Sequence, residues 1–270
     1  MIKYPSKKEE EKKMNKPIVG LQLYTLREYC KSPKDTARTL EKVSRIGYRV
    51  VQLSGIGPID TRELKNILDS NGLYACSTHT AYEKLLGELD EVIEEHQILG
   101  AEAIICPGLP SKLHNREGYL KATEELKKVI EKVKKNGFTL GYHNHAIELE
   151  RYREKTGLEI LLDGCPSLEG EIDTYWIQHG GGDPAFWIEK YSGRVSEVHF
   201  KDMGMKQNEQ IMVPVGEGNL NWPHILNSCE KAKVKYCLVE QDTCQIDPFD
   251  SVRISFENMK GWGLQIDLPT

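Results

Sequence analysis

The chain has 270 residues, of which 39% are hydrophobic, and its formal net charge is -5. This length allows one or two domains with a sizeable core, and an α/β barrel of ~250 residues is a familiar case of a single domain. The mildly acidic balance argues against nucleic acid as a partner.

Seven cysteines are scattered along the chain without a C-x-x-C pair. Their odd number argues against a disulfide framework and favours free thiols in a reducing cytoplasm. No run of ~18 apolar residues occurs, so we expect no membrane span. Residues 1–16 are charged and lack the apolar stretch of a secretory signal. We therefore expect a disordered leader over 1–16 and a single domain over 17–270.

From residue 17 onward, short apolar runs alternate with helical patterns. The first run covers residues 18–24, and Ser32 and Pro33 then open a helix that Gly47 ends. The expected strands are 18–24, 48–55, 73–79, 101–108, 138–145, 168–176, 195–202 and 234–242. Between and after them we expect helices that end near 47, 72, 100 and 137, a short helix over 156–163, helices that follow Pro184 and Pro223, and a last helix over 248–260.

Continuous apolar strands that are separated by helices imply a parallel sheet with its outer face covered. Eight such units that close on themselves form a (β/α)8 TIM barrel of the α/β class. The alternative is an open, doubly wound sheet, which usually has a glycine-rich turn after its first strand. No such turn follows residues 18–24, so the sequence favours the barrel.

In this fold, functional side chains gather at the carboxyl ends of the strands. The polar candidates there are Gln22, Gln52, His79, His143, His145, Asp173, Trp176, His199, Lys201 and Glu240. Asp173, His199 and Glu240 each end an apolar run, where a buried charge or imidazole is costly unless it is paired or metal-bound. A divalent cation (Mn, Zn, Co or Mg) would satisfy all three residues, and a metal-free hydrogen-bonded network is the alternative.

The segments that contain these residues resemble a known family. EIDTYW, VHFKD and LVEQD, with VGEGNLNWPHIL after the seventh strand, are similar to the xylose-isomerase-like barrels of sugar isomerases and epimerases, which also include inosose dehydratases and endonuclease IV. The resemblance covers residues 17–264 and implies a catalytic domain with four metal ligands on strands five to eight. It places three of these ligands at Asp173, His199 and Glu240.

The fourth ligand, on strand five, departs from the family pattern. The epimerase branch carries a glutamate six residues after the glycine that starts the strand, and His143 occupies that position here. His143 and His145 lie two residues apart, so on a strand both point to the same side of the sheet. We expect His143 as the ligand, and His145 as either the ligand or an acid/base that faces the substrate.

The resemblance implies a metal-dependent isomerase or epimerase that removes a proton beside the carbonyl of a keto-sugar or keto-cyclitol. Glu240 would act as one base, and His145 or Lys201 would supply the other proton, because the second family carboxylate is missing. That replacement also suits a lyase, such as an inosose dehydratase or an enzyme that cleaves 3-keto-glycosides by elimination.

The remaining candidates have two interpretations each. Gln22, Gln52 and His79 are expected to bind substrate hydroxyls, or else to be satisfied core residues. Trp176 is expected to stack on a sugar ring, or else to pack in the core. A DNA-cleaving enzyme is disfavoured by Cys106, where that branch has a histidine, and by the charge balance. A non-catalytic sugar-binding barrel is the other alternative. The expected partner is a carbohydrate, and a homodimer is compatible with the sequence.

Overall fold

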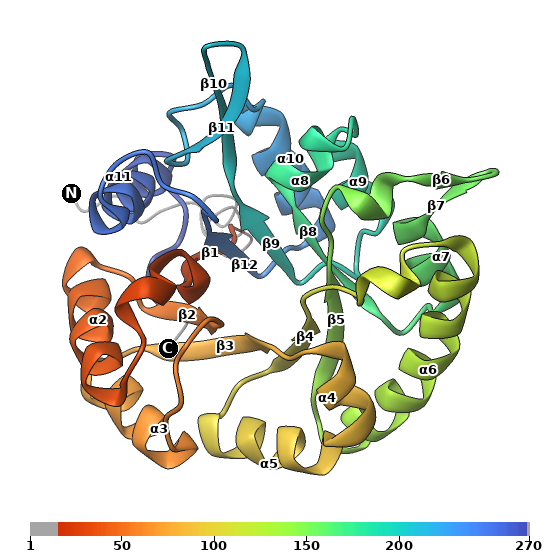
Figure 1. The fold of residues 1–270 in the computed structure, drawn as a ribbon. Coiled ribbons are helices and arrows are strands. Elements are labelled where there is room, and N and C mark those ends of the chain that lie inside the picture. The colour runs from red at the N-terminus through yellow and green to blue at the C-terminus, as the bar shows by residue number, and fades with distance from the viewer. Residues whose placement is uncertain (1–15, 269–270) are drawn as a thin grey trace, which may run out of the picture.

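A computed structural model describes residues 16–268, and a closed barrel of eight parallel strands forms its centre (Figure 1). The barrel strands are β1 (Ile18–Gln22), β2 (Val50–Leu53), β3 (Tyr74–His79), β4 (Ala103–Cys106), β5 (Thr139–His143), β8 (Glu169–Asp173), β9 (Glu197–Phe200) and β12 (Tyr236–Val239). They pair in this order, and β12 closes the ring onto β1. The prediction of a (β/α)8 barrel is confirmed. The predicted leader lies outside the described residues except for Lys16.

Helices surround the strands in an outer ring (Figure 1). The α-helices are α2 (Pro33–Ile46), α3 (Thr61–Ser70), α4 (Tyr82–Gly87), α5 (Leu89–Leu99), α6 (Arg116–Lys135), α7 (Gly157–Gly164), α8 (Thr174–His179), α9 (Pro184–Lys190), α10 (Trp222–Ala232) and α11 (Pro248–Gly261). The 3₁₀ helices are η1 (Leu23–Tyr29), η2 (Ser111–Leu113) and η3 (Ile147–Leu149). The residues after Gln22 therefore turn into η1 instead of extending the first strand to residue 24, as the sequence predicted.

Local sequence explains where helix α2 begins and ends. The side chain of Ser32 accepts a hydrogen bond from the backbone N–H of Asp35, and Pro33 occupies the first helical turn, where its missing N–H costs nothing. Gly47 ends the helix with φ 126°, and a Cβ at this position would lie 2.5 Å from the ring of Phe256. The predicted start and stop of this helix are confirmed.

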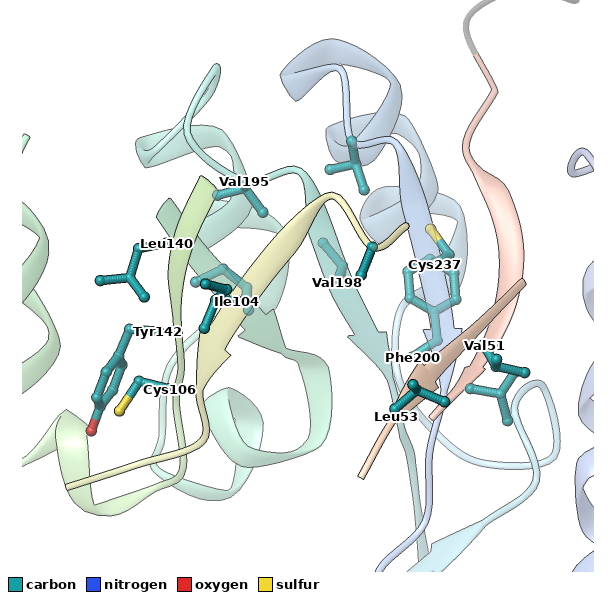
Figure 2. Close-up of a cluster of buried hydrophobic side chains, with 14 of the residues drawn as sticks. Val51, Leu53, Ile104, Cys106, Leu140, Tyr142, Val195, Val198, Phe200 and Cys237 are labelled. Atoms are coloured by element: carbon teal, nitrogen blue, oxygen red, sulfur yellow. The ribbon is translucent and has the colours of Figure 1, made fainter. Parts of the chain in front are cut away.

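The main hydrophobic core lies between the strands and the helices (Figure 2). Alternate strand residues, such as Ile104 and Leu140, point into this layer. Cys106 and Tyr142 are paired neighbours on β4 and β5 and belong to the same core. Neither residue is exposed, and both contribute to helix–strand packing.

The inside of the barrel has an apolar floor and a polar upper part. Ile18, Val50, Cys76, Tyr236 and Leu238 form a separate buried cluster at the level where the strands begin. The buried polar side chains inside the barrel are Gln22, Gln52, Ser77, Glu171 and Glu197, and of these Glu197 lies at the start of its strand, paired with Tyr236. Alternation places Ile18 with Gln22, and Val50 with Gln52, on the same inner face, whereas Cys76 and Ser77 are consecutive and lie where the register between β2 and β3 shifts.

Two hairpins extend the loops at the carboxyl end of the barrel. One consists of β6 (Arg151–Tyr152) and β7 (Lys155–Thr156), and the other of β10 (Asp202–Lys206) and β11 (Glu209–Val213), which projects beyond the ring (Figure 1). The sequence analysis did not predict either hairpin. Within residues 16–268, no helix combines the length and the apolar character that a membrane crossing requires.

Candidate metal centre

Four neighbouring strands bring four potential ligands together at the carboxyl end of the barrel. His143 ends β5, Asp173 ends β8, His199 lies in β9, and Glu240 directly follows β12. Each offers one ligand atom, these atoms all lie within 4.8 Å of one another, and all four side chains are buried. The four residues that the sequence analysis named as metal ligands therefore converge.

The contacts within this cluster are short. Nε2 of His143 lies 3.3 Å from Oδ2 of Asp173. Nδ1 of His199 lies 2.9 Å from Oε2 of Glu240 and 3.7 Å from Oδ2 of Asp173. Two imidazole nitrogens thus face two carboxylate oxygens across a small buried space.

The second oxygen of Asp173 holds the local backbone. Its Oδ1 accepts a hydrogen bond of 2.8 Å from the N–H of Trp176, which caps helix α8. The N–H of Asp173 in turn donates to the side chain of Asn144. Because Oδ1 is used by the helix cap, Oδ2 is the oxygen that is left to face the cluster.

Lys201 is fully buried and contacts three carboxylates. Its Nζ lies 3.0 Å from Asp173, 2.7 Å from Glu240 and 2.9 Å from Asp242. Burial alone would lower the pKa of Lys201, but these carboxylates raise it above its usual value. The group is therefore a permanent cation, and its predicted role as a proton donor stays a prediction.

The charges of this cluster fit a divalent cation. Asp173, Glu240 and Asp242 contribute three negative charges, of which the ammonium of Lys201 compensates one. Burial alone would lower the pKa of His199, but Glu171 and Glu240 raise it well above its usual value, so the surrounding carboxylates attract additional positive charge. Mn, Zn, Co and Fe are typical of sites that combine nitrogen and oxygen ligands, and they are less typical of all-oxygen sites.

His145 and Trp176 lie next to the cluster. The ring centroid of His145 is 4.8 Å from that of His143 and 5.5 Å from the centroid of Trp176, and His145 is partly exposed. Burial lowers the pKa of His145 to about 4, so its imidazole is neutral near pH 7. Trp176 is also partly exposed, and its ring centroid lies 5.4 Å from Nζ of Lys201.

The three side chains that were predicted to bind substrate hydroxyls lie deeper than expected. Gln22 and Gln52 have no exposed surface, and their amides bond to each other and to neighbouring protein groups. Nε2 of His79 lies 2.8 Å from Oε2 of Glu171, and its ring stacks on that of His199. Substrate contact by these three residues stays a prediction.

Three acidic residues at this site were not among the sequence candidates. Glu171 and Glu197 lie inside the barrel, and Asp242 contacts Lys201. Burial and the neighbouring Glu171 raise the pKa of Glu197 well above its usual value. Glu171 and Glu197 stand two residues before Asp173 and His199, so the alternation of a strand would have placed them on the same inner face.

The fold and this cluster define a (β/α)8 barrel with a buried His/Asp/Glu group that could hold a metal ion. The chain belongs to the family described as "Xylose isomerase-like TIM barrel", whose model matches residues 40–262. The family resemblance in the sequence is thereby confirmed. A comparison with curated proteins found no match.

Several solved structures share the fold. A sugar phosphate isomerase/epimerase from Parabacteroides distasonis is 24% identical over 91% of this chain and 94% of that chain, with a TM-score of 0.74. A D-allulose 3-epimerase from Methylomonas sp. is 16% identical over 91% and 98%, with a TM-score of 0.71. A probable 3-DHS dehydratase from Bacillus anthracis is 14% identical over 90% and 98%, with a TM-score of 0.70. At these identities the similarity concerns the fold.

Proposed function

We propose that this protein is a divalent-metal-dependent enzyme that moves a proton beside the carbonyl of a keto-sugar or keto-cyclitol, as an isomerase or epimerase. The observation that carries the proposal is the convergence of His143, Asp173, His199 and Glu240 at the barrel end where enzymes of this fold place their sites. The proposal also fits the fold neighbours that are described as epimerases.

The same four residues would hold the metal ion. A bound divalent cation supplies Lewis-acid polarisation of neighbouring carbonyl and hydroxyl oxygens, which acidifies the adjacent C–H bond. The protein holds these ligands in place through the helix cap of Asp173 and the buried contacts of His199. Lys201 compensates part of the negative charge and does not itself transfer a proton in this proposal.

Glu240 and His145 are the proposed proton-transfer groups. Both short contacts of Glu240, to His199 and to Lys201, are made by Oε2, so Oε1 is left to take a proton from the substrate. His145 lies beside His143 and Trp176 and is partly exposed. Its neutral imidazole is able to accept the proton of a substrate hydroxyl and return it to the carbonyl oxygen, while Glu240 returns the proton that it took to the neighbouring carbon. Trp176 would contact the apolar face of the sugar ring.

A lyase is the second candidate, and the composition of the acid/base pair favours it. His143 replaces the second family carboxylate, so Glu240 is the one carboxylate base, and in an elimination it would take a proton at one carbon and pass that proton to the leaving oxygen at the next. One fold neighbour is described as a probable dehydratase. Both candidates begin with removal of the same kind of proton.

The test is proton exchange in D₂O. Metal-stripped protein is reloaded with Mn, Zn, Co or Mg and incubated with ketoses, keto-cyclitols and 3-keto-glycosides, all without phosphate groups. An isomerase or epimerase incorporates deuterium beside the carbonyl and retains every oxygen, whereas a lyase releases water or the aglycone. We expect Glu240→Gln to abolish exchange. Failure of every metal-loaded form to exchange a proton on any of these substrates would contradict the proposal.

A further inference from the structure

Below the proposed ligands, a chain of buried hydrogen bonds reaches Nε2 of His199, the nitrogen that faces away from Asp173 and Glu240. Oε1 of Gln52 lies 2.7 Å from this nitrogen, and Oε2 of Glu171 lies 3.2 Å from it. Gln52, Glu171 and His199 are all buried. The identity of the atom that Gln52 presents to His199 therefore decides which imidazole nitrogen carries a proton.

The orientation of the Gln52 amide is fixed by the groups around its nitrogen. Nε2 of Gln52 lies 2.8 Å from Oγ of Ser77, 2.5 Å from Oε1 of Glu171 and 3.0 Å from Oε2 of Glu197. Oγ of Ser77 uses its own proton on Glu197, at 2.6 Å, so it accepts from Gln52. A reversed amide would turn the carbonyl oxygen of Gln52 toward these oxygens, which is unfavourable in a buried site.

The oxygen side of the amide gives the same orientation independently. The backbone N–H of Tyr24 donates to Oε1 of Gln22 at 3.2 Å, so the amide nitrogen of Gln22 points toward Gln52. This nitrogen donates to Oε1 of Gln52. A backbone donor at one end and two carboxylates at the other thus both place Oε1 of Gln52 against His199.

We propose that Gln52 is a positioning residue which, supported by Glu171, keeps the proton of His199 on Nε2 and directs the lone pair of Nδ1 toward Asp173 and Glu240 as the metal-binding atom. An acceptor 2.7 Å from Nε2 requires a proton on that nitrogen. Nδ1, which lies 2.9 Å from Oε2 of Glu240, is then the nitrogen that a bound cation would take in place of a proton. Such partners orient a ligating histidine and increase its basicity. The inference rests on the metal centre of the proposed function. It gives Gln52 the role of orienting the ligand His199, instead of binding a substrate hydroxyl.

A second arrangement of the same residues would compete with this one. His79, His143 and Glu171 also present ligand atoms within 4.8 Å of one another, so Glu171 could itself ligate a second cation. Glu171 already faces Gln52 on one oxygen and His79 and His199 on the other. We therefore expect one metal ion per chain.

The first test uses the wild-type protein loaded with zinc, which is diamagnetic. Nitrogen-15 NMR of the histidine side chains should show His199 with a proton on Nε2 that exchanges slowly with water and with zinc on Nδ1, at one zinc per chain. Zinc on Nε2 of His199, or two zinc ions per chain, would overturn the inference. This measurement needs no variant and no turnover.

The second test compares two buried glutamines. Gln52→Met removes the acceptor of His199, whereas Gln22→Met removes one donor to that acceptor and leaves the acceptor itself in place. We expect Gln52→Met to weaken zinc binding ~10–100-fold and to speed the exchange of the Nε2 proton, and Gln22→Met to change zinc affinity less than Gln52→Met does. Equal zinc affinities of both variants and the wild type would overturn the inference.

The inference and the proposed function fail in different ways. Zinc on Nδ1 together with the expected loss in Gln52→Met, but without proton exchange on any keto-sugar, would support the inference and contradict the proposed reaction. Proton exchange in a protein whose His199 binds zinc through Nε2 would support the reaction and overturn the inference. A wild type that binds no divalent cation would overturn both.

Discussion

Nζ of Lys201 lies 2.7 Å from Oε2 of Glu240, the same oxygen that faces Nδ1 of His199 at 2.9 Å. One carboxylate oxygen is thus shared between a permanent cation of the protein and a proposed ligand of the metal. Asp173 is shared in the same way, since its Oδ2 contacts Lys201 at 3.0 Å and His143 at 3.3 Å. Lys201 therefore contributes to the stability of the metal-free protein and to the charge balance of the site.

Replacement of Lys201 should destabilise the metal-free protein strongly. In Lys201→Met, the buried carboxylates of Asp173 and Glu240 and the partly exposed one of Asp242 lose their ammonium partner, and we expect the free energy of unfolding in EDTA to fall by ~3–5 kcal/mol. Saturating zinc should reduce this loss, because the bound ion compensates the same charges. Urea unfolding with and without zinc measures both quantities.

A matched control is Lys235→Met, which removes an exposed lysine that pairs with Glu102 on the surface. This variant should lose less than ~1 kcal/mol, with or without zinc. If Lys201→Met is as stable in EDTA as the wild type, the carboxylates around Lys201 do not carry the charges that we assign to them.

Asp173→Asn should separate metal binding from folding. The amide oxygen of asparagine preserves the cap on the N–H of Trp176, so helix α8 should remain intact. Loss of the charged ligand oxygen should weaken zinc binding by more than the ~10–100-fold expected for loss of an outer partner. Competition with a chelating dye measures the affinity, and EDTA should no longer lower the unfolding midpoint of this variant.

Asp183→Asn is the control for that substitution, because Asp183 caps helix α9 and does not belong to the cluster. Its zinc affinity should equal that of the wild type. Unchanged zinc affinity in Asp173→Asn would remove Asp173 from the ligand set.

His143 and His145 should respond differently to the same change. His143→Asn should lower zinc affinity, because His143 belongs to the converging group and is buried. His145→Asn should keep zinc affinity within a few-fold and lower turnover by ~10²–10⁴-fold, as expected for loss of a general acid/base. The opposite result would identify His145 as the ligand and move the acid/base role away from it.

The pH dependence of stability should show the burial of His96, which lies in α5 and does not belong to the proposed ligands. Nε2 of His96 bonds to Thr78 and Nδ1 to the carbonyl of Val92, and burial lowers its pKa below the ordinary value of 6.5. The unfolded chain therefore binds the proton more readily. The stability contribution is complete above pH 6.5 and decreases as the pH falls below it, by at most ~1.4 kcal/mol per pH unit.

The measurement is the difference in unfolding free energy between the wild type and His96→Gln in EDTA, from pH 7.5 to pH 5. This difference should become less favourable to the wild type as the pH falls. A difference that stays constant across this range would show that His96 is protonated equally in the folded and the unfolded chain.

The fold was predictable because its strands are buried on both faces and several of its helices, such as α2, carry clear caps. The apolar runs of β4 and β12 and the Ser32–Pro33 start of α2 each specify one kind of element. The β10–β11 hairpin gave no comparable pattern. Its turn residues Gln207 and Asn208 have φ of 49° and 66°, a turn that usually shows Asn-Gly, and no glycine marks it here.

The sequence predicted the site residues that lie at the ends of the strands, but not those that lie deeper in the barrel. Asp173, His199 and Glu240 were found because each is a polar residue at the end of an apolar run, and His143 was found because it occupies the strand-five ligand position of the family that the sequence resembles. Glu171 and Glu197 lie one alternation deeper, and their importance depends on contacts across the barrel, such as that of Gln52 with Glu171. Gln52 on β2 and Glu171 on β8 are hydrogen-bonded across the barrel interior. The spacing of residues within either strand does not indicate such a contact.

The apolar floor of the barrel has a consequence for the order of events. Ile18, Val50, Cys76, Tyr236 and Leu238 fill the amino-terminal end, so a hydrated ion has its approach from the opposite rim. A sugar seated over the cluster would cover that same approach. The ion should therefore bind before the sugar, and the ion should dissociate more slowly while the sugar is bound.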